Sequence, residues 1–239
     1  MKSLITAFSF LTIIPLKQTD FNKNILKNSL RYYSVVGFFI GVILYLITFL
    51  NLNADLTTIL ILLSWVIITG GFHLDGLADV CDAIGSFKNR DKAFEIMKDS
   101  RIGAMGTVAI SLSLIFKFFL IKNILFSSPL ILMLSPVYGR YSINFLSKNL
   151  DYAKSEGLGK FIADNTDMET FIVSTIFVVA VTLFTGIAFI FLLLSIYIFL
   201  ILISYFFHKK FNGVTGDMLG ATVELTEIIT MFLGVYFAS

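Results

Sequence analysis

Residues 171–207 read FIVSTIFVVAVTLFTGIAFIFLLLSIYIFLILISYFF, and no charged residue interrupts them. An α-helix rises about 1.5 Å per residue, so a single helix over this length would reach roughly 55 Å. The hydrocarbon core of a bilayer is only about 30 Å thick. Thr185 and Gly186 lie near the middle of the stretch. The pattern therefore predicts two membrane helices that are joined by a hairpin at this point.

The composition of the whole chain also indicates an integral membrane protein. Hydrophobic residues make up 57% and charged residues 14% of its 239 residues, whereas soluble domains are about 45–50% apolar and about 25% charged. We expect one domain over residues 1–239, because the length favours one or at most two. A net charge of +2 argues against a nucleic-acid-binding surface. The single cysteine, Cys81, excludes an intramolecular disulfide.

Seven segments approach the roughly 20 apolar residues that a membrane helix needs. They are residues 33–50, 56–72, 103–121, 128–146, 170–186, 188–207 and 219–237. Residues 4–16 are too short to span, and we expect them to lie at the interface or to re-enter the membrane. The predicted fold class is an all-α, polytopic membrane bundle of about seven transmembrane helices. A long cytoplasmic loop is expected after the second helix.

Lysine and arginine are concentrated in alternate loops, which predicts the orientation, since basic loops stay in the cytoplasm. The basic loops are residues 17–31, which include Lys17, and residues 73–102, 147–169 and 208–218. The connection over residues 51–55 and the turn near Gly186 carry no basic residue, and residues 122–127 carry only Lys122. We therefore predict that the N-terminus and the four basic loops are cytoplasmic and that the C-terminus is outside.

The most polar motif borders the second predicted span and reads GGFHLDGLADVCD, from Gly70 to Asp82. Asp75, Asp79 and Asp82 recur at i, i+4 and i+7, a spacing that places them on one face of a helix. Like charges at this spacing destabilise a helix unless a cation compensates, and such carboxylates suit Mg²⁺. Gly76 would leave room for a substrate or a second helix. The alternative is a solvated acidic helix end just outside the membrane.

A second motif reads GVTGDMLGA, from Gly213 to Ala221, and precedes Glu224 and Glu227. Asp217 and Glu224 are seven residues apart and so share a helical face. Within this motif Asp217 is a candidate metal ligand and Gly216 a candidate substrate contact. An ionisable residue inside a span is by default a functional candidate, so Glu224 is expected to contact substrate. The alternative for both glutamates is a protonated side chain that is hydrogen-bonded to a neighbouring helix.

Two cationic segments are candidates for binding an anionic substrate. Ser100 and Arg101 precede Gly103, at a helix start whose backbone N–H groups could hold phosphate. Arg140 lies about 9 Å inside the cytoplasmic end of the fourth predicted span by helix rise. Its alternative role is to snorkel, with only the charged head in water. Arg101 and Arg140 are therefore candidates for phosphate neutralisation.

Two weaker candidates accompany these segments. The flexible loop SEGLGK, residues 155–160, contains Gly157 and Lys160. Gly157 is a candidate substrate contact, whereas the charge of Lys160 either steers substrate or only sets the topology. His73 could ligate or donate to phosphate, but a lone interfacial histidine is as often structural.

The residues alone favour a Mg²⁺-dependent transferase that acts on a phosphoanhydride at the cytoplasmic membrane surface. Acidic clusters from two spans together with arginine suit phosphoryl transfer, in which catalysis is mostly positioning and charge neutralisation. A rival hypothesis is a cation-coupled transporter whose acids form an ion pathway. The acids crowd at one membrane face, however, and transport sites usually lie near the midplane.

The Gly70–Asp82 motif closely resembles the signature of the cobalamin synthase, or adenosylcobinamide-GDP ribazoletransferase, family. The resemblance continues in order through the segments Phe10–Pro15, Glu95–Gly103, Arg140, Glu156–Gly159 and Thr215–Leu225. The short DGxxA core is also similar to that of CDP-alcohol phosphotransferases, which stay as the alternative enzyme class. Those enzymes usually have arginine after the alanine, where this chain has Asp79.

The resemblance implies a Mg²⁺-requiring step of cobalamin assembly at the prokaryotic cell membrane. In this reaction adenosylcobinamide-GDP is joined to α-ribazole or its 5′-phosphate, GMP is released, and adenosylcobalamin or its phosphate is formed. Combined with the residues, it predicts that Mg²⁺ is held by the four aspartates of the two motifs (Asp75, Asp79, Asp82 and Asp217). Asp82 is also the predicted general base. Arg101 and Arg140 would neutralise charge on the phosphates.

Overall fold

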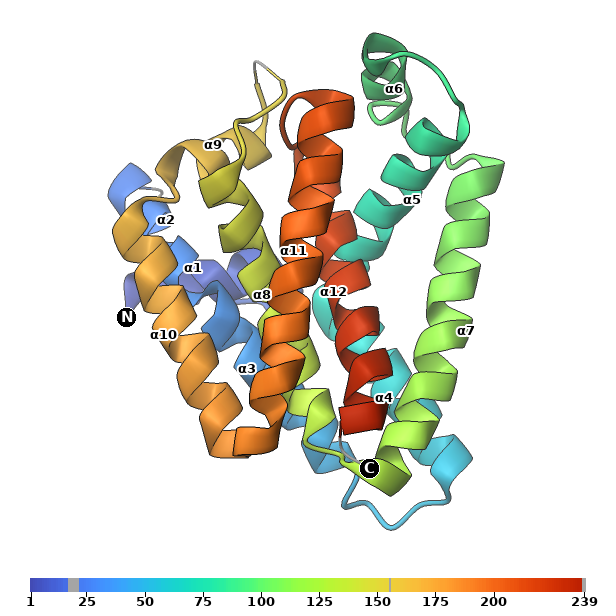
Figure 1. The fold of residues 1–239 in the computed structure, drawn as a ribbon. Helices are drawn as coiled ribbons and strands as arrows, with labels where there is room; N and C mark the ends of the chain where they lie inside the picture. Colours follow the sequence, from blue (N-terminus) through green and yellow to red (C-terminus); the bar gives the residue numbers. More distant parts are fainter. Residues whose placement is uncertain (17–21, 155, 238–239) are drawn as a thin grey trace.

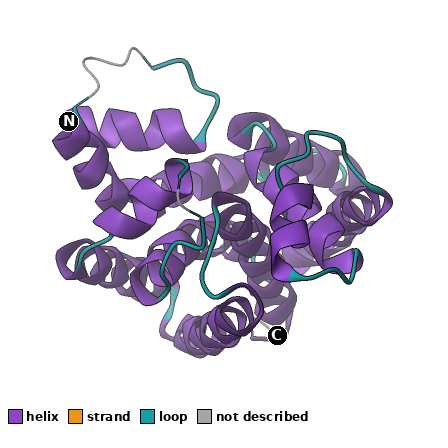
Figure 2. Cartoon of the chain, turned by 90° about the horizontal axis from the view of Figure 1, so that it is seen from above, coloured by secondary structure: helices purple, strands orange, loops and turns teal. Residues whose placement is uncertain are grey.

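A computed structural model describes residues 1–16, 22–154 and 156–237 of the chain. Lys17 and Ser155, which belong to two of the predicted basic loops, lie outside the described residues. Regular structure within the described ranges is helical, as Figure 2 shows from above. The helices are α1 (Lys2–Leu11), α2 (Lys23–Ser29), α3 (Tyr33–Ile47), α4 (Ala54–Thr69), α5 (Phe72–Gly85), α6 (Arg90–Ile96), α7 (Ala104–Ser127), α8 (Ile131–Asn149), α9 (Leu158–Asn165), α10 (Met168–Thr185), α11 (Ile190–Phe211) and α12 (Gly216–Phe237).

Each of the seven predicted apolar segments forms a helix, namely α3, α4, α7, α8, α10, α11 and α12. Five helical stretches in the described part of the chain are long and apolar enough to cross a membrane: Lys23–Ile47, Ala104–Ser127, Met168–Thr185, Ile187–Phe211 and Gly216–Phe237. The bent pair α4 and α5 gives a sixth if it is counted as one span. Length and composition therefore support five or six spans.

Residues 73–102, predicted as a long connection between spans with the aspartates on a helical face, are largely helical in the structure. Its first half is α5 and its second half contains α6. The axis of α5 is bent by 85° from that of α4. Gly70 and Gly71 lie at the bend with φ of 63° and 70°, a left-handed conformation that glycine adopts without steric cost. The two glycines end α4 and turn the chain into a new helix that begins at Phe72.

Helix α8 is the central element of the bundle. Every residue from Ile131 to Ser147 is buried, and α3, α10, α11 and α12 lie around it (Figure 1). A helix that is enclosed by protein on all sides does not have to present an apolar surface to lipid. This explains why α8 can carry several polar side chains and falls outside the set of apolar candidate spans.

The N-terminal segment forms the short apolar helix α1 instead of a span. Ala7 and Leu11 of this helix are buried against the bundle. The N–H of Ile13 donates a 2.9 Å hydrogen bond to the carbonyl of Ile68, so the chain after α1 is attached to the end of α4. The expectation that this segment is too short to span agrees with its length in the structure.

The basic loops of the chain lie at one end of the bundle. Helices α6 and α9 and the turn between α11 and α12 lie at one end, which we call the polar end (Figure 1). The turn between α10 and α11 and the C-terminus lie at the opposite end (Figure 1). The basic loops after α5, α8 and α11 thus share one end of the molecule.

Candidate functional site

Helices α5 and α12 approach each other closely at the polar end. A Cβ atom on Gly76 would lie 2.7 Å from the carbonyl oxygen of Asp217, and a Cβ on Gly220 would lie 3.7 Å from the Cα atom of Gly76. Only glycine permits a backbone contact this close. The sequence left open whether Gly76 makes room for a substrate or for a second helix. The structure shows that α12 lies there. The contact brings together two acidic motifs that are far apart in the sequence.

The aspartates of the two motifs form a single acidic group. Asp75 is exposed, and Asp79, Asp82 and Asp217 are partly buried. Asp79 experiences the negative charges of the other three carboxylates and the positive charge of Lys154. The predicted helical face of α5 therefore points toward the start of α12.

The acidic group does not form a closed metal cage. Among the described residues, no three histidine, cysteine or acidic side chains lie close enough together to hold a metal ion. Mg²⁺ is commonly bound by only one or two carboxylates, with water and substrate phosphates completing its octahedron. The hard oxygen donors of Asp75, Asp79 and Asp217 fit this chemistry, provided that a phosphate-bearing substrate supplies the remaining ligands.

Asp82 is engaged with the first turn of α7. Its carboxylate oxygens accept hydrogen bonds from the N–H groups of Gly103, at 2.7 Å, and Gly106, at 2.8 Å. A carboxylate at this place satisfies unpaired N–H groups and interacts favourably with the helix dipole. Two of the N–H groups that the sequence suggested for phosphate are thus already engaged. Asp82 serves as the cap of α7 in this structure.

Arg101 lies on the surface just before α7. Its Nη2 atom is 2.6 Å from Oδ2 of Asp99, and its side chain is 86% exposed. Hydrogen bonds from the Arg101 guanidinium lower the pKa of Asp99 to about 2. Ser100 is also exposed. Both predicted substrate contacts are therefore accessible from solvent at the polar end.

The loop after α8 adds a cation that the sequence interpretation counted only as a topology signal. Nζ of Lys154 lies 3.3 Å from Oδ2 of Asp217. The Thr215 hydroxyl donates to the same oxygen at 3.4 Å. The N–H of Ala153 donates to the carbonyl of Val214 at 2.9 Å, which ties this loop to the start of α12. Gly216, a predicted substrate contact, is exposed. Gly157 follows this loop and is exposed, with φ of 128°.

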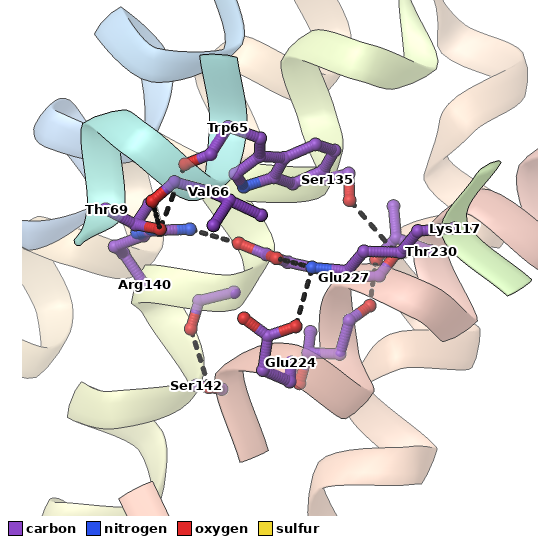
Figure 3. A network of polar contacts seen from close by, with 12 residues as sticks. Trp65, Val66, Thr69, Lys117, Ser135, Arg140, Ser142, Glu224, Glu227 and Thr230 are labelled. Carbon is purple, nitrogen blue, oxygen red and sulfur yellow. Dashed lines mark hydrogen bonds and ion pairs between the residues drawn. The ribbon is translucent and has the colours of Figure 1, made fainter. Parts of the chain in front are cut away.

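A second charged cluster lies deep inside the bundle (Figure 3). Nζ of Lys117 on α7 is 2.7 Å from Oε2 of Glu224 and 2.6 Å from Oε2 of Glu227. The guanidinium of Arg140 on α8 pairs with Oε1 of Glu227. The indole ring of Trp65 covers the Lys117 ammonium at 4.6 Å. The four charges balance, and none of the four charged side chains is more than 5% exposed.

This cluster, which we call the buried charge network (Lys117, Arg140, Glu224 and Glu227), changes the interpretation of several predicted residues. Arg140 is completely buried and pairs with Glu227, so it does not snorkel. Glu224 contacts an ammonium group inside the bundle. His73, a further predicted substrate contact, is also buried at 7% exposure.

Lys117 is the residue of this network that the sequence interpretation missed. Its signal was present, because a lone lysine in an apolar span demands a partner within the membrane. Glu224 and Glu227, in the last predicted span, are the acidic residues that pair with Lys117. The pairing was not evident because the two positions Lys117 and Glu227 are 110 residues apart.

Comparison with known proteins shows which family the chain is similar to. A protein-family model described as cobalamin-5-phosphate synthase matches residues 3–235. An adenosylcobinamide-GDP ribazoletransferase of Clostridium botulinum (strain Langeland) is 37% identical, and the match covers 98% of each chain. The protein of the same name from Clostridioides difficile (strain 630) is 36% identical, over 96% of this chain and 95% of its own.

A less similar relative carries the same name. The adenosylcobinamide-GDP ribazoletransferase of Fusobacterium nucleatum is 31% identical over 98% of this chain and 96% of its own. No solved structure matches the chain. The similarity therefore extends along the full length of these bacterial proteins, and it includes both acidic motifs.

Proposed function

Because the chain belongs to the cobalamin-5-phosphate synthase family, we propose that its polar end joins adenosylcobinamide-GDP to α-ribazole or α-ribazole 5′-phosphate. The chain is a transferase of cobalamin biosynthesis and a multi-pass membrane protein of bacteria. The products are GMP and adenosylcobalamin or its 5′-phosphate.

One observation carries the proposal for the site. The backbone of α5 at Gly76 packs directly against that of α12 at Asp217. This contact gathers carboxylates from two separate motifs at one end of the bundle. A diphosphate is bound best where cations and metal-binding carboxylates converge, because its transfer requires charge neutralisation.

Mg²⁺ is the proposed cofactor, and its carboxylate ligands are proposed to be one or two of Asp75, Asp79 and Asp217, with water and substrate phosphates completing its coordination. When bound, it would neutralise the diphosphate of adenosylcobinamide-GDP and polarise its phosphorus centres. Asp82 leaves this set, because both of its oxygens are engaged by α7. It orients the first turn of α7 and the adjoining Arg101 instead.

In the proposed reaction, a ribose hydroxyl of α-ribazole attacks the phosphorus that is attached to cobinamide. A new O–P bond forms, and the bond between this phosphorus and the oxygen of GMP breaks. One carboxylate of the acidic group accepts the hydroxyl proton. Lys154, which lies beside Asp217, and the exposed Arg101 neutralise the phosphates as charge moves onto the departing GMP.

The buried charge network has a positioning role in this proposal. It connects α7, α8 and α12 through Lys117, Arg140 and the two glutamates. Helix α12 carries Asp217 at its first turn, so the network determines where that carboxylate lies. Both buried glutamates are paired with cations of the network, which disfavours a cation-transport pathway through them.

We further propose seven crossings within one membrane domain over residues 1–239. The bent pair α4 and α5 makes one crossing, and the enclosed helix α8 makes another. The polar end and the N-terminus face the cytoplasm in this arrangement. Support comes from the basic residues of the loops at the polar end, since basic loops are retained in the cytoplasm.

The proposal is tested with detergent-purified protein that is supplied with adenosylcobinamide-GDP, α-ribazole 5′-phosphate and Mg²⁺. Release of GMP and formation of the corrinoid product are followed with and without EDTA. We expect metal-dependent turnover that is lost in Asp75→Asn, with normal membrane insertion of the variant. Lys92→Ala is the control, because Lys92 is an exposed residue of α6.

Two results would overturn parts of this proposal. Full activity of Asp75→Asn would remove Asp75 from the metal site. Absence of product from well-folded protein would reject the reaction itself. CDP-alcohol substrates would then be tested in the same preparation, followed by cation flux in liposomes.

A further inference from the structure

Helix α6 lies at the polar end, in the connection between α5 and α7 (Figure 1). Its side chains reach two segments from elsewhere in the chain. Nη2 of Arg90 donates a 3.3 Å hydrogen bond to the carbonyl of Ala153, in the loop after α8. The ring of Phe94 packs on that of Phe211 at the end of α11, with centroids 5.9 Å apart. Helix α6 is therefore fixed both to this loop and to the end of α11.

The ring of Phe94 also contacts Lys154, the cation beside the acidic group. Nζ of Lys154 is 5.7 Å from the ring centroid, within the roughly 6 Å over which an aromatic ring attracts a cation. The same atom is 3.3 Å from Oδ2 of Asp217, and the Lys154 side chain is only 16% exposed. The ammonium group thus has two partners, an aromatic ring and a carboxylate.

Backbone hydrogen bonds position the loop after α8 but not the side chain of Lys154. The N–H of Ala153 donates to the Val214 carbonyl, and the N–H of Val214 donates to the Asp151 carbonyl, both at 2.9 Å. A lysine side chain is long and flexible, and it loses rotamer entropy when it is held in one place. The place of the ammonium group is therefore decided by its side-chain partners.

The two partners of Lys154 differ in how they respond to a metal ion. Asp217 is a proposed ligand of Mg²⁺, and a cation bound there would repel the ammonium group and compete for the same carboxylate. The ring of Phe94 has no net charge and attracts the ammonium group through its π face. This attraction persists when the carboxylate is occupied, so the ring can keep the ammonium group near the phosphates of a bound substrate.

We propose that Phe94 is a positioning residue, whose ring keeps the Lys154 ammonium group at the acidic group to meet the donor diphosphate. The proposal rests on the proposed function, in which Lys154 neutralises the phosphates. Arg90 supports the same arrangement by fixing the backbone next to Lys154. Phe94 acts only through Lys154 in this arrangement.

The first test measures the reactivity of the Lys154 amine and needs no turnover. Full-length protein in detergent is trace-labelled with acetic anhydride, and acetylation of Lys154 relative to the exposed Lys23 is read by mass spectrometry. Phe94→Leu keeps an apolar side chain against Phe211 and is expected to raise this ratio about threefold, as for the loss of a cation–π contact. Phe94→Tyr keeps a ring and should restore the ratio of the unmodified protein. Phe87→Leu is the matched control, because it removes an exposed ring from the same connection.

Steady-state kinetics with adenosylcobinamide-GDP, α-ribazole 5′-phosphate and Mg²⁺ test whether Phe94 acts through Lys154. Phe94→Leu should lower kcat about threefold and leave the KM for α-ribazole 5′-phosphate unchanged. In a Lys154→Met background the same substitution should have no further effect, because residues that act through one contact are not additive. A loss of kcat that persists in this background would mean that Phe94 has only a structural role, and would overturn the proposal.

The two measurements separate this proposal from the proposed function. Phe94→Met is a second variant without a ring, with a flexible side chain that fills irregular space, so the result does not depend on the folding of one variant. Unchanged labelling of Lys154 in both variants would overturn the positioning role even if the unmodified protein turns over. Raised labelling without release of GMP by the unmodified protein would reject the proposed reaction, and with it the role toward the phosphates, while the support of Lys154 by Phe94 stands.

Discussion

The carboxylate of Asp82 is held by the backbone of Gly103, whose N–H lies 2.7 Å from Oδ2. This bond connects the acidic helix α5 to the first turn of α7, the helix that carries Lys117 further along. Sequence spacing alone placed Asp82 with the metal ligands. The structure instead gives it the role of a cap, so its contributions to stability and to catalysis can be separated by mutation.

Asp82→Ala should destabilise the protein by about 1–2 kcal/mol, as expected for the loss of a helix cap. Asp82→Asn should cost less, because the amide oxygen still accepts one hydrogen bond. Thermal unfolding in detergent, followed by circular dichroism, measures both losses. A folded Asp82→Asn protein that is as inactive as Asp75→Asn would return Asp82 to the catalytic group.

Gly76→Ala should destabilise the contact between α5 and α12. The added Cβ would lie 2.7 Å from the Asp217 carbonyl oxygen, and such overpacking costs about 1–3 kcal/mol. Gly216→Ala is the matched stability control, since a Cβ there meets no atom within 4 Å. Equal melting temperatures for the two variants would mean that the helices are free to separate.

Lys117→Met should be the most destabilising single change in the buried charge network. It leaves Glu224 and Glu227 without their shared ammonium group, and removal of one partner of a buried ion pair costs about 3–5 kcal/mol. Lys122→Met, which breaks the exposed pair with Asp55, should cost less than about 1 kcal/mol.

The same measurement distinguishes lost charge from lost packing in the network. Adding Glu224→Gln to Lys117→Met removes the carboxylate that has lost its cation, whereas Glu227 keeps Arg140, and should recover part of the stability. If the double variant unfolds at the same temperature as Lys117→Met, the effect of that substitution does not come from charge.

Asp217→Asn should reduce kcat by about 100-fold, a magnitude typical of losing one group that stabilises transition-state charge. Its melting temperature should remain close to that of the unmodified protein, because Asp217 is partly exposed. Asp91→Asn, an exposed carboxylate in the first turn of α6, serves as the control. A proportional loss in both variants would indicate a general effect of negative charge at the polar end.

Asp99→Asn should not alter the pH dependence of activity between about pH 5 and about pH 9. The Arg101 guanidinium lowers the pKa of Asp99 from 3.8 to about 2. A depressed pKa means that the ion pair is fully formed above pH 4 and is lost only as the pH falls toward about 2. A shift of the acidic limb of the pH–rate profile in Asp99→Asn would contradict this assignment.

Hydrophobic patterning predicted the helices well, because bilayer thickness sets the length of apolar sequence that a span requires. The hairpin at Gly186 and the short N-terminal helix follow from the same rule. Polar patterning placed the aspartates after Gly71 on one helical face, but it did not predict the 85° bend between α4 and α5 or the short helix α6.

The sequence predicted the residues of the candidate site that share one helix, but not the contacts between helices. Spacing within one helix is local, so the shared face of Asp75, Asp79 and Asp82 was evident from sequence. The engagement of Asp82 by Gly103 and the pairing of Lys154 with Asp217 depend on how separate helices pack. Periodicity contains no information about such contacts.

The sequence by itself therefore determined the class of protein, its apolar helices and the two motifs that carry the acidic residues. Only the tertiary structure decided which of these residues meet. It brought Asp217 against Gly76 at the polar end, and it enclosed Arg140 with Glu227 and Lys117 in the middle of the bundle. The physical reason is that apolar length and helical period are properties of a single segment, whereas a buried ion pair requires two segments to exclude water around both partners.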